Sequence, residues 1–308
     1  MIHLIAIKLG VAPRTGSIRR CGLGVALALA VGAGLLPRSV CADAVTAEAV
    51  RVSTETYAPH EGQFAPLRGT YRYEVAWQGI PAAEVTVDLK EEAGRYRVTT
   101  AARTNSAIDI FYKLRYRAEG LISSFDLTPF KTFIDNRENS RQKLVQMTFL
   151  ENGEIESVRS QTGKPSTVTR INTGNFTLDP FSAAFLARSL SWERGVSRDF
   201  DTYNGKTRYL ITLTAVDKIK MDVNGRSRDV WVISPTVRNL NDPKSNSKLR
   251  EAKIYITADP EREILQIVSK VFVGAVTTKL VEFSPRPSSP APLQMAQQQT
   301  RRVSFRFF

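Results

Sequence analysis

Few side chains of the types that carry catalysis occur in this 308-residue sequence. Its cysteines are Cys21 and Cys41, and its histidines are His3 and His60. Nucleophilic cysteine, Cys/His zinc sites and thioredoxin-like redox chemistry need such residues within the folded chain. Both cysteines lie in an N-terminal segment that we expect to be removed, which excludes these classes. His60 falls in a poorly patterned segment, so we predict that it is solvated rather than a base or a metal ligand.

The carboxylates form two sets whose spacing would suit acid–base chemistry. Asp199 and Asp201 are one set, and Asp259, Glu261 and Glu263 are the other. Each set alternates along an extended segment, which places its side chains on one face. Two carboxylates that face each other across a cleft can act as general acid and base, as in glycoside hydrolysis. Surface charges beside a hairpin explain the same spacing, and we favour this second interpretation.

Three other motifs are incomplete. Gly205, Lys206 and Thr207 match the end of a phosphate-binding loop, but Phe200 stands where that loop needs its first glycine. Residues 222–225 begin like a calcium loop and lack its later ligands. No G-x-S-x-G sequence occurs, so nothing supports the nucleophile turn of an α/β-hydrolase. We therefore predict no catalytic residue, no metal site and no cofactor.

The N-terminus has the pattern of an export signal. Arg19 and Arg20 precede an uncharged apolar run at 21–36, and small residues follow up to Ala42 and Ala44. The run is short for a membrane span, so we predict a signal peptide over 1–42 and no transmembrane segment in the mature chain. The expected location is the periplasm. An uncleaved signal anchor is the alternative.

The net charge and its distribution limit the classes of partner that we expect. Cleavage after Ala44 would remove five basic residues and one acidic residue, which lowers the net charge from +13 to +9. The remaining basic residues are spread along the chain and mixed with acids, unlike the clustered pattern of a nucleic-acid surface, so we expect no nucleic-acid partner. A positive field permits peripheral contact with a membrane or other anionic envelope material. Without thiols, the mature chain must be held by its apolar core.

From residue 69 onwards the sequence has the period of antiparallel β-structure. Tyr71, Tyr73, Val75 and Trp77 fall on one face of an extended segment. Asn-Gly steps at 152–153, 204–205 and 224–225 favour tight hairpin turns. Six further segments are rich in β-branched and aromatic residues: 143–150, 207–216, 229–233, 251–257, 263–273 and 277–283. We predict an all-β, antiparallel domain over 67–284, preceded by a flexible lead-in at 43–66.

Helices are expected to be few. Asp179 is a good N-cap and Pro180 a good first helical residue, and Phe181 and Phe185 then follow at helical spacing. Residues 108–114 are a weaker candidate for a second short helix. Residues 285–308 are rich in Pro, Ser and Gln, and we expect a disordered tail there. Its last residues could dock on the sheet edge of an envelope protein partner.

Several segments together resemble the bacterial exported domain of unknown function catalogued as family 3108. The resemblance covers residues 67–284 and is carried by the segments 69–82, 179–183, 200–209, 254–257, 273–275 and 280–283. It implies a β-rich envelope protein whose sheet forms an open or spiral, barrel-like structure. It implies no catalytic residue, because the family defines none.

Two classes of function remain. The first is a non-enzymatic periplasmic scaffold or binding module whose curved sheet shelters a lipid-like or peptide ligand. Tyr73, Trp77, Phe185 and Arg188 are its candidate ligand-binding residues, and the alternative for them is a place in the core. The second is an envelope hydrolase that acts on wall or lipid substrates with carboxylates as acid and base. Only the acidic sets support an enzyme, so we favour the binding module.

Overall fold

The computed structural model describes residues 45–46, 52, 54–59, 64–223, 225–242, 251–271 and 274–286. The predicted signal peptide at 1–42, His60, Asn224 and tail residues 287–308 lie outside the described residues. None of the helices that the structure describes has the length and hydropathy needed to span a bilayer.

Sixteen strands form a single sheet in the order β1-β9-β8-β7-β6-β5-β4-β3-β2-β16-β15-β14-β13-β12-β11-β10. Neighbours are antiparallel except at the two ends, where β1 pairs with β9 and β10 with β11 in parallel. The strands are β1 (Val45–Thr46), β2 (Gly69–Trp77), β3 (Ile80–Glu92), β4 (Arg95–Thr104), β5 (Leu114–Ser123), β6 (Pro129–Glu138), β7 (Arg141–Phe149), β8 (Glu154–Gln161), β9 (Lys164–Asn172), β10 (Thr177–Leu178), β11 (Ser197–Tyr203), β12 (Arg208–Val223), β13 (Arg226–Asn239), β14 (Glu251–Thr257), β15 (Ile264–Lys270) and β16 (Ala275–Pro285).

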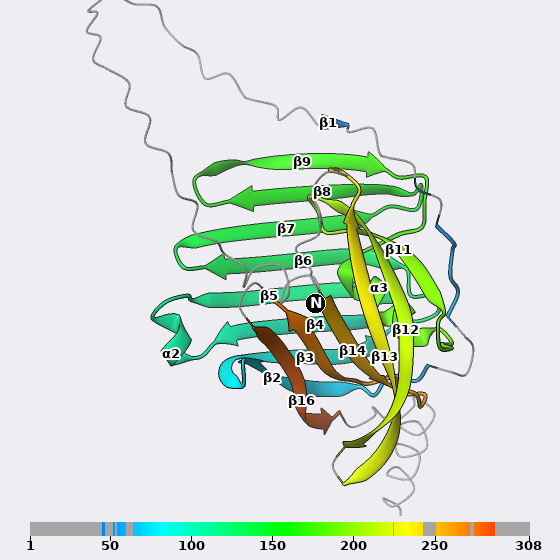
Figure 1. The fold of residues 1–308 in the computed structure, drawn as a ribbon. Coiled ribbons are helices and arrows are strands. Elements are labelled where there is room, and N and C mark those ends of the chain that lie inside the picture. The colour runs from blue at the N-terminus through cyan, green and yellow to red at the C-terminus, as the bar shows by residue number, and fades with distance from the viewer. Residues whose placement is uncertain are drawn as a thin grey trace, which may run out of the picture.

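The sheet folds over on itself. Strands β2 to β9 make one layer, and β11 to β16 cross in front of it at a steep angle (Figure 1). Register shifts at six strand pairs supply local bends, because a bulged strand kinks and twists more strongly than a regular one. This confirms the predicted fold class, an antiparallel, barrel-like sheet with few helices.

The two ends of the sheet meet through side chains, since no ladder joins them among the described strands. The turn between β11 and β12 reaches the inner face of β7 and β8, where the Ser157 hydroxyl donates to the Gly205 carbonyl at 2.7 Å. Gly205 has φ +84°, and a Cβ there would collide with Val145. Tyr203 packs beside it on Met147 and Ile155. The Asn204-Gly205 step is thus a hairpin turn, as predicted, and it closes the spiral.

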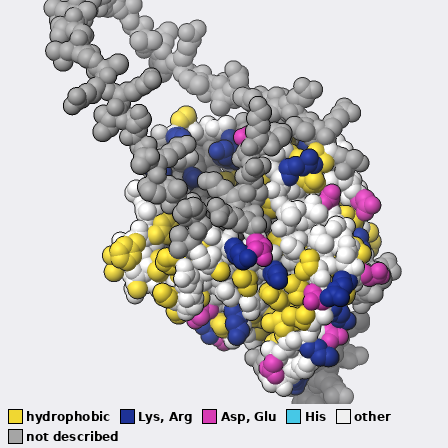
Figure 2. All heavy atoms as spheres, viewed as in Figure 1, with side chains coloured by type: hydrophobic (Ala, Val, Ile, Leu, Met, Phe, Trp, Pro, Cys, Tyr) yellow, Lys and Arg dark blue, Asp and Glu magenta, His cyan; other side chains and the backbone are white. Residues whose placement is uncertain are grey.

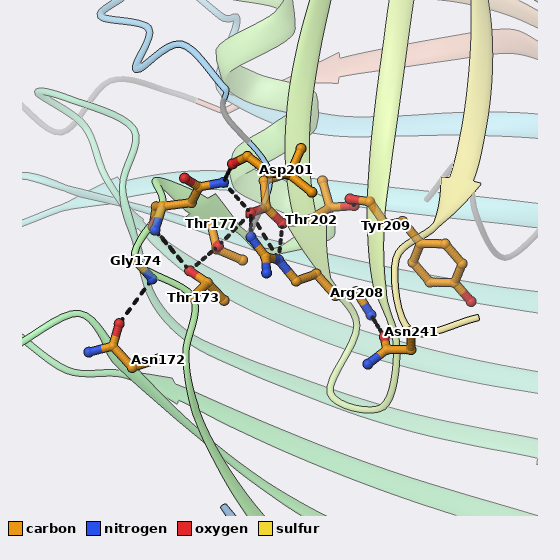
Figure 3. A network of polar contacts seen from close by, with 11 residues as sticks. Asn172, Thr173, Gly174, Thr177, Asp201, Thr202, Arg208, Tyr209 and Asn241 are labelled. Carbon is orange, nitrogen blue, oxygen red and sulfur yellow. Dashed lines mark hydrogen bonds and ion pairs between the residues drawn. The ribbon is translucent and has the colours of Figure 1, made fainter. Parts of the chain in front are cut away.

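A buried ion pair fastens the same end of the sheet (Figure 3). Arg208 donates from Nε to Oδ1 of Asp201 at 2.8 Å, and the side chains are only 3% and 0% exposed. Thr177 and Asn175 donate to the same carboxylate at 3.1 and 3.2 Å. The Asn241 side chain accepts from the Arg208 backbone N–H. The desolvated carboxylate of β11 therefore holds β12 and the 175–177 segment directly, and Asn241 joins them through the Arg208 backbone.

Helix α3 (Pro180–Ser189) lies between the two layers, in contact with β5 on one side and β11 on the other (Figure 1). It begins where the Asp179-Pro180 pattern predicts. The second helix, α2 (Ser106–Asp109), is a single turn, and Leu114 of the predicted 108–114 helix belongs to β5. The chain can form β5 there because Tyr116, Ala118 and Ile122 alternate as buried residues.

Parts of the predicted lead-in contact the core. The Tyr57 ring lies 5.2 Å from that of Phe200, and the Phe64 ring lies 5.9 Å from that of Phe185. The Ala65 backbone N–H donates to the Pro260 carbonyl at 2.7 Å.

Gly120 sets how closely α3 approaches β5, because a Cβ on this residue would lie 2.5 Å from Cδ2 of Phe181. We expect Gly120→Ala to lower the free energy of unfolding by about 1 to 3 kcal/mol through overpacking, measured by urea denaturation. In a Phe181→Ala background the same substitution should cost much less. An equal loss in both backgrounds would show that the contact with Phe181 is not the cause.

Candidate ligand-binding site

A cavity of about 60 Å³ lies between α3 and the inner face of the sheet. Its lining comes from four strands and the helix: Tyr71, Tyr73, Val87, Leu89, Val98, Thr100, Pro180, Phe181, Ala184, Phe185, Arg188, Ile264 and Ile267. Native interiors contain few voids larger than a water molecule, so a space of this size is a distinct feature. Three of the four residues predicted from the sequence, Tyr73, Phe185 and Arg188, meet here.

Arg188 is the charged group of this cavity. It donates from Nε to the carbonyl of Arg262 at 2.6 Å and from Nη2 to that of Glu261 at 3.1 Å. Its guanidinium carbon lies 5.3 and 5.2 Å from the ring centroids of Phe64 and Phe185. Backbone carbonyls and aromatic faces therefore hold a buried cation in place of a carboxylate. Burial accordingly lowers the pKa of Arg188.

The left-handed backbone of Arg262 belongs to this arrangement. Arg262 has φ +48° in the turn between β14 and β15, and its carbonyl is the nearer acceptor for Arg188. Nothing in the sequence indicated that backbone carbonyls would be the partners of Arg188. A turn conformation at a non-glycine residue leaves little signal in a single sequence.

Two tyrosines lie along the cavity wall on β2. Burial is the main cause that raises the pKa of Tyr71 to about 12, and it also raises the pKa of Tyr73. The Tyr71 hydroxyl donates to the Leu67 carbonyl at 2.7 Å. Both phenols therefore stay neutral under ordinary conditions and present an apolar ring with a polar end.

Thr100 is the site residue that sequence reasoning missed. It is 2% exposed, it lines the cavity from β4, and its hydroxyl has no hydrogen-bond partner among the described residues. Buried polar groups in native proteins are nearly always paired, so each exception calls for an explanation. The alternation of Val98 with Thr100 was the available signal, but β4 was not among the predicted strands.

Trp77 does not line the cavity. It keeps the phase of Tyr73 along β2, but four residues at about 3.3 Å each place it roughly 13 Å further along the strand. There it is the last residue of β2 and is 41% exposed. The alternation of residues along β2 predicted correctly which face of the strand carries Trp77. It could not show how far along the strand the cavity extends.

The acidic sets are engaged in ion pairs and hydrogen bonds. Arg228 binds Asp259 and Glu263, and its Nη2 lies 3.7 Å from Glu261. Of the other set, Asp201 is in the buried ion pair described above. Asp199 accepts a hydrogen bond from the Thr212 hydroxyl. The described residues contain no group of three His, Cys, Asp or Glu side chains arranged to hold a metal ion.

Comparison with known proteins identifies the family. Residues 72–281 match the family described as Protein of unknown function (DUF3108). The chain belongs to the DUF3108 family. No curated protein matches the sequence significantly.

The fold of this DUF3108 protein is similar to that of solved structures. One is a crystal structure described as a beta-barrel-like protein of domain of unknown function DUF1849 from Brucella abortus. The TM-score is 0.50 at 9% sequence identity, and the likeness covers 73% of this chain and 100% of the other. At such low identity the likeness concerns the fold alone.

Asp179 holds the N-terminus of α3 from a fully buried position. Its side chain accepts from the Ser182 backbone N–H at 2.6 Å and from the hydroxyls of Ser182 and Thr132. The pKa of this carboxyl is raised, chiefly because burial disfavours the charged form. The stability that this raised pKa contributes is therefore fully present at a pH below the pKa of the carboxyl in the unfolded chain. It is lost as the pH rises through the pKa of the carboxyl in the folded protein.

For Asp179→Ala we expect the free energy of unfolding of this DUF3108 protein to fall by about 2 kcal/mol, because the cap and its partners are lost. Asp179→Asn keeps a capping oxygen and should cost far less. Urea denaturation from about pH 4 to about pH 8 provides the check, since the asparagine variant should lose less stability than the wild type as the pH rises. Parallel pH profiles for the two proteins would contradict this account.

Proposed function

We propose that this DUF3108 protein is a non-enzymatic, periplasmic binding module that takes the end of a lipid-like chain into the cavity beneath α3. The observation that carries the proposal is the Thr100 hydroxyl, which has no partner among the described residues, in a cavity lined mainly by apolar side chains. A ligand with an oxygen atom at the right place along an apolar chain would satisfy it.

The volume of the cavity limits the size of the ligand group that it can bind. About 60 Å³ equals the space of about two water molecules in the liquid and falls well below the roughly 300 to 1,000 Å³ of a drug-sized site. A slender chain end fits this description better than a ring system. The buried Arg188 borders the same space and is a second polar group for such a ligand.

Support for the binding class also comes from the carboxylates. An enzyme that used them would need two acids free to exchange protons at a common cleft. Asp201 is desolvated beside Arg208, and Arg228 engages Asp259 and Glu263. Acidic and basic side chains are also intermixed over the face of the molecule shown in Figure 2.

Peripheral contact with a membrane is part of the proposal. Ile110 and Phe111 are 78% and 84% exposed directly after α2, and Ile80 is 61% exposed. The Asn105 side chain donates to the Pro81 carbonyl at 2.6 Å, which places these apolar residues in one region of the surface. Exposed apolar groups of this kind mark interaction surfaces.

A cavity-filling substitution tests the ligand site. We expect 1-octanol to bind the wild-type protein in calorimetric titrations, because each methylene of its chain end that is buried contributes about 0.8 kcal/mol. Ala184→Leu should fill the cavity and reduce octanol affinity by about tenfold or more. Ala183→Leu is the matched control, since its neighbour Ala184 lines the cavity and Ala183 does not. Equal affinities for both variants and the wild type would refute the site.

Thr100→Val tests the unpartnered hydroxyl independently. The substitution keeps the shape of the side chain and removes a buried group that makes no hydrogen bond, so the free energy of unfolding should rise by about 1 kcal/mol. Octanol affinity should fall in the same variant. A loss of stability in urea denaturation would mean that the hydroxyl is already satisfied in the folded protein.

A further inference from the structure

A second hollow lies on the inner face of the sheet, on the side of β6 to β9. Its volume is about 380 Å³, within the range of small-molecule sites. The lining combines apolar, polar and basic side chains: Ile134, Asn136, Lys143, Leu144, Val145, Arg159, Ser160, Gln161, Lys164, Pro165, Thr167, Pro180, Asn204, Lys206 and Tyr209. We call this hollow the cationic groove. Of the motifs identified in the sequence, the incomplete phosphate-loop match at 205–207 contributes Lys206 to this lining.

The groove gathers positive charge without a matching acid in its lining. Lys143, Arg159, Lys164 and Lys206 all border it, and no carboxylate does among the described residues. Arg159, Lys164 and Lys206 form no ion pair with the described part of the chain. Elsewhere on the sheet, arginines face carboxylates, as Arg170 does Glu156 and Arg137 does Asp135. The gathering of Arg159, Lys164 and Lys206 without ion pairs among the described residues requires an explanation of its own.

Strand register explains how the groove arises from residues distant in sequence. Asn136 pairs with Lys143, and Lys143 pairs with Gln161 across β6, β7 and β8. Arg159 lies in the adjoining row, opposite Val145. The turn after β11 brings Asn204 and Lys206 over this row, because Gly205 is seated on Ser157.

Two buried polar atoms in the groove lack hydrogen-bond partners within the part of the chain that the structure describes. The Nε atom of Arg159 is a donor without an acceptor, and the Oδ1 atom of Asn136 is an acceptor without a donor. Asn136 is 8% exposed, and its Nδ2 donates to Glu138 at 2.7 Å, which fixes the amide so that Oδ1 is left over. A complementary ligand group would both accept a hydrogen bond and donate one.

We propose that the cationic groove binds the phosphate head of a singly alkylated phosphate monoester. The oxygens of such a group accept hydrogen bonds from Arg159 and face the lysines. Because its second pKa is about 6, it also retains a proton for Asn136 at mildly acidic pH. The adjacent Ile134, Val145 and Pro180 side chains would cover the first methylenes of the chain. This assignment stands apart from the cavity beneath α3.

The experiment compares octyl phosphate, octyl sulfate, inorganic phosphate and 1-octanol in calorimetric titrations at submicellar concentration, near pH 6. In the Ala184→Leu variant, in which the cavity beneath α3 is filled, octyl phosphate should bind with one-to-one stoichiometry and more tightly than octyl sulfate, which has no proton to donate. It should also bind more tightly than inorganic phosphate, which has no chain. Arg159→Gln and Lys206→Gln should each weaken octyl phosphate binding by about tenfold. Arg117→Gln, on the exposed outer face of β5, makes the same change in charge and should leave binding unaltered.

Three outcomes would overturn the assignment. Equal affinity for inorganic phosphate and octyl phosphate would make the groove a free-phosphate site. An equal loss in Arg117→Gln and Arg159→Gln would reveal a diffuse field rather than a site. No binding of octyl phosphate at all would also refute it. Ala184→Leu separates the two proposals, because it should abolish octanol binding and leave the effect of Arg159→Gln on octyl phosphate intact.

Discussion

The burial of α3 between the two layers of one sheet is the constraint on which the rest of the structure depends. A helix that enters an apolar interior brings unpaired N–H groups at its first turn, and these must be satisfied without water. Asp179 and Ser182 do this as a buried capping box, and Thr132 of β6 ties the carboxylate to the sheet. Because Gly120 has no side chain, the ring of Phe181 can pack directly against β5. Local hydrogen bonding and close packing thus position one helix against the centre of the sheet.

With α3 fixed, the open sheet can close around it without a continuous ladder. The ends are joined where the β11–β12 turn is seated on Ser157, and the Arg208–Asp201 ion pair holds β11 and β12 together at that end. A closure of this kind differs from a sealed barrel, in which every edge is hydrogen-bonded. It leaves hollows on both sides of the helix, and Pro180 borders each of them. The same helix therefore divides the inner face into two compartments.

Local patterns in the sequence were enough to predict those elements whose structure depends mainly on residues close along the chain. Alternation identified β2, the Asp179-Pro180 pair identified the start of α3, and the Asn-Gly steps at 152–153 and 204–205 identified turns. The cavity could be anticipated in part, since Tyr73, Phe185 and Arg188 do meet. The cationic groove could not, because Asn136, Arg159 and Lys206 come together only through the register of separate strands and the seating of a turn. That register is decided by long-range packing, which a single sequence does not display.

The two hollows on either side of α3 also differ in the chemistry of their lining residues. On the side of β2 to β4 the hollow is small and apolar, with Thr100 and the carbonyl-bound Arg188 as its polar points. On the side of β6 to β9 it is larger, and its basic residues are unmatched by acids in the lining. A sheet selected only for stability would gain nothing from an unpaired donor and an unpaired acceptor buried in one groove, since each costs about 1 to 3 kcal/mol. Retention of both, beside three cations without ion pairs, is the pattern of a surface shaped for an anionic ligand rather than for the core.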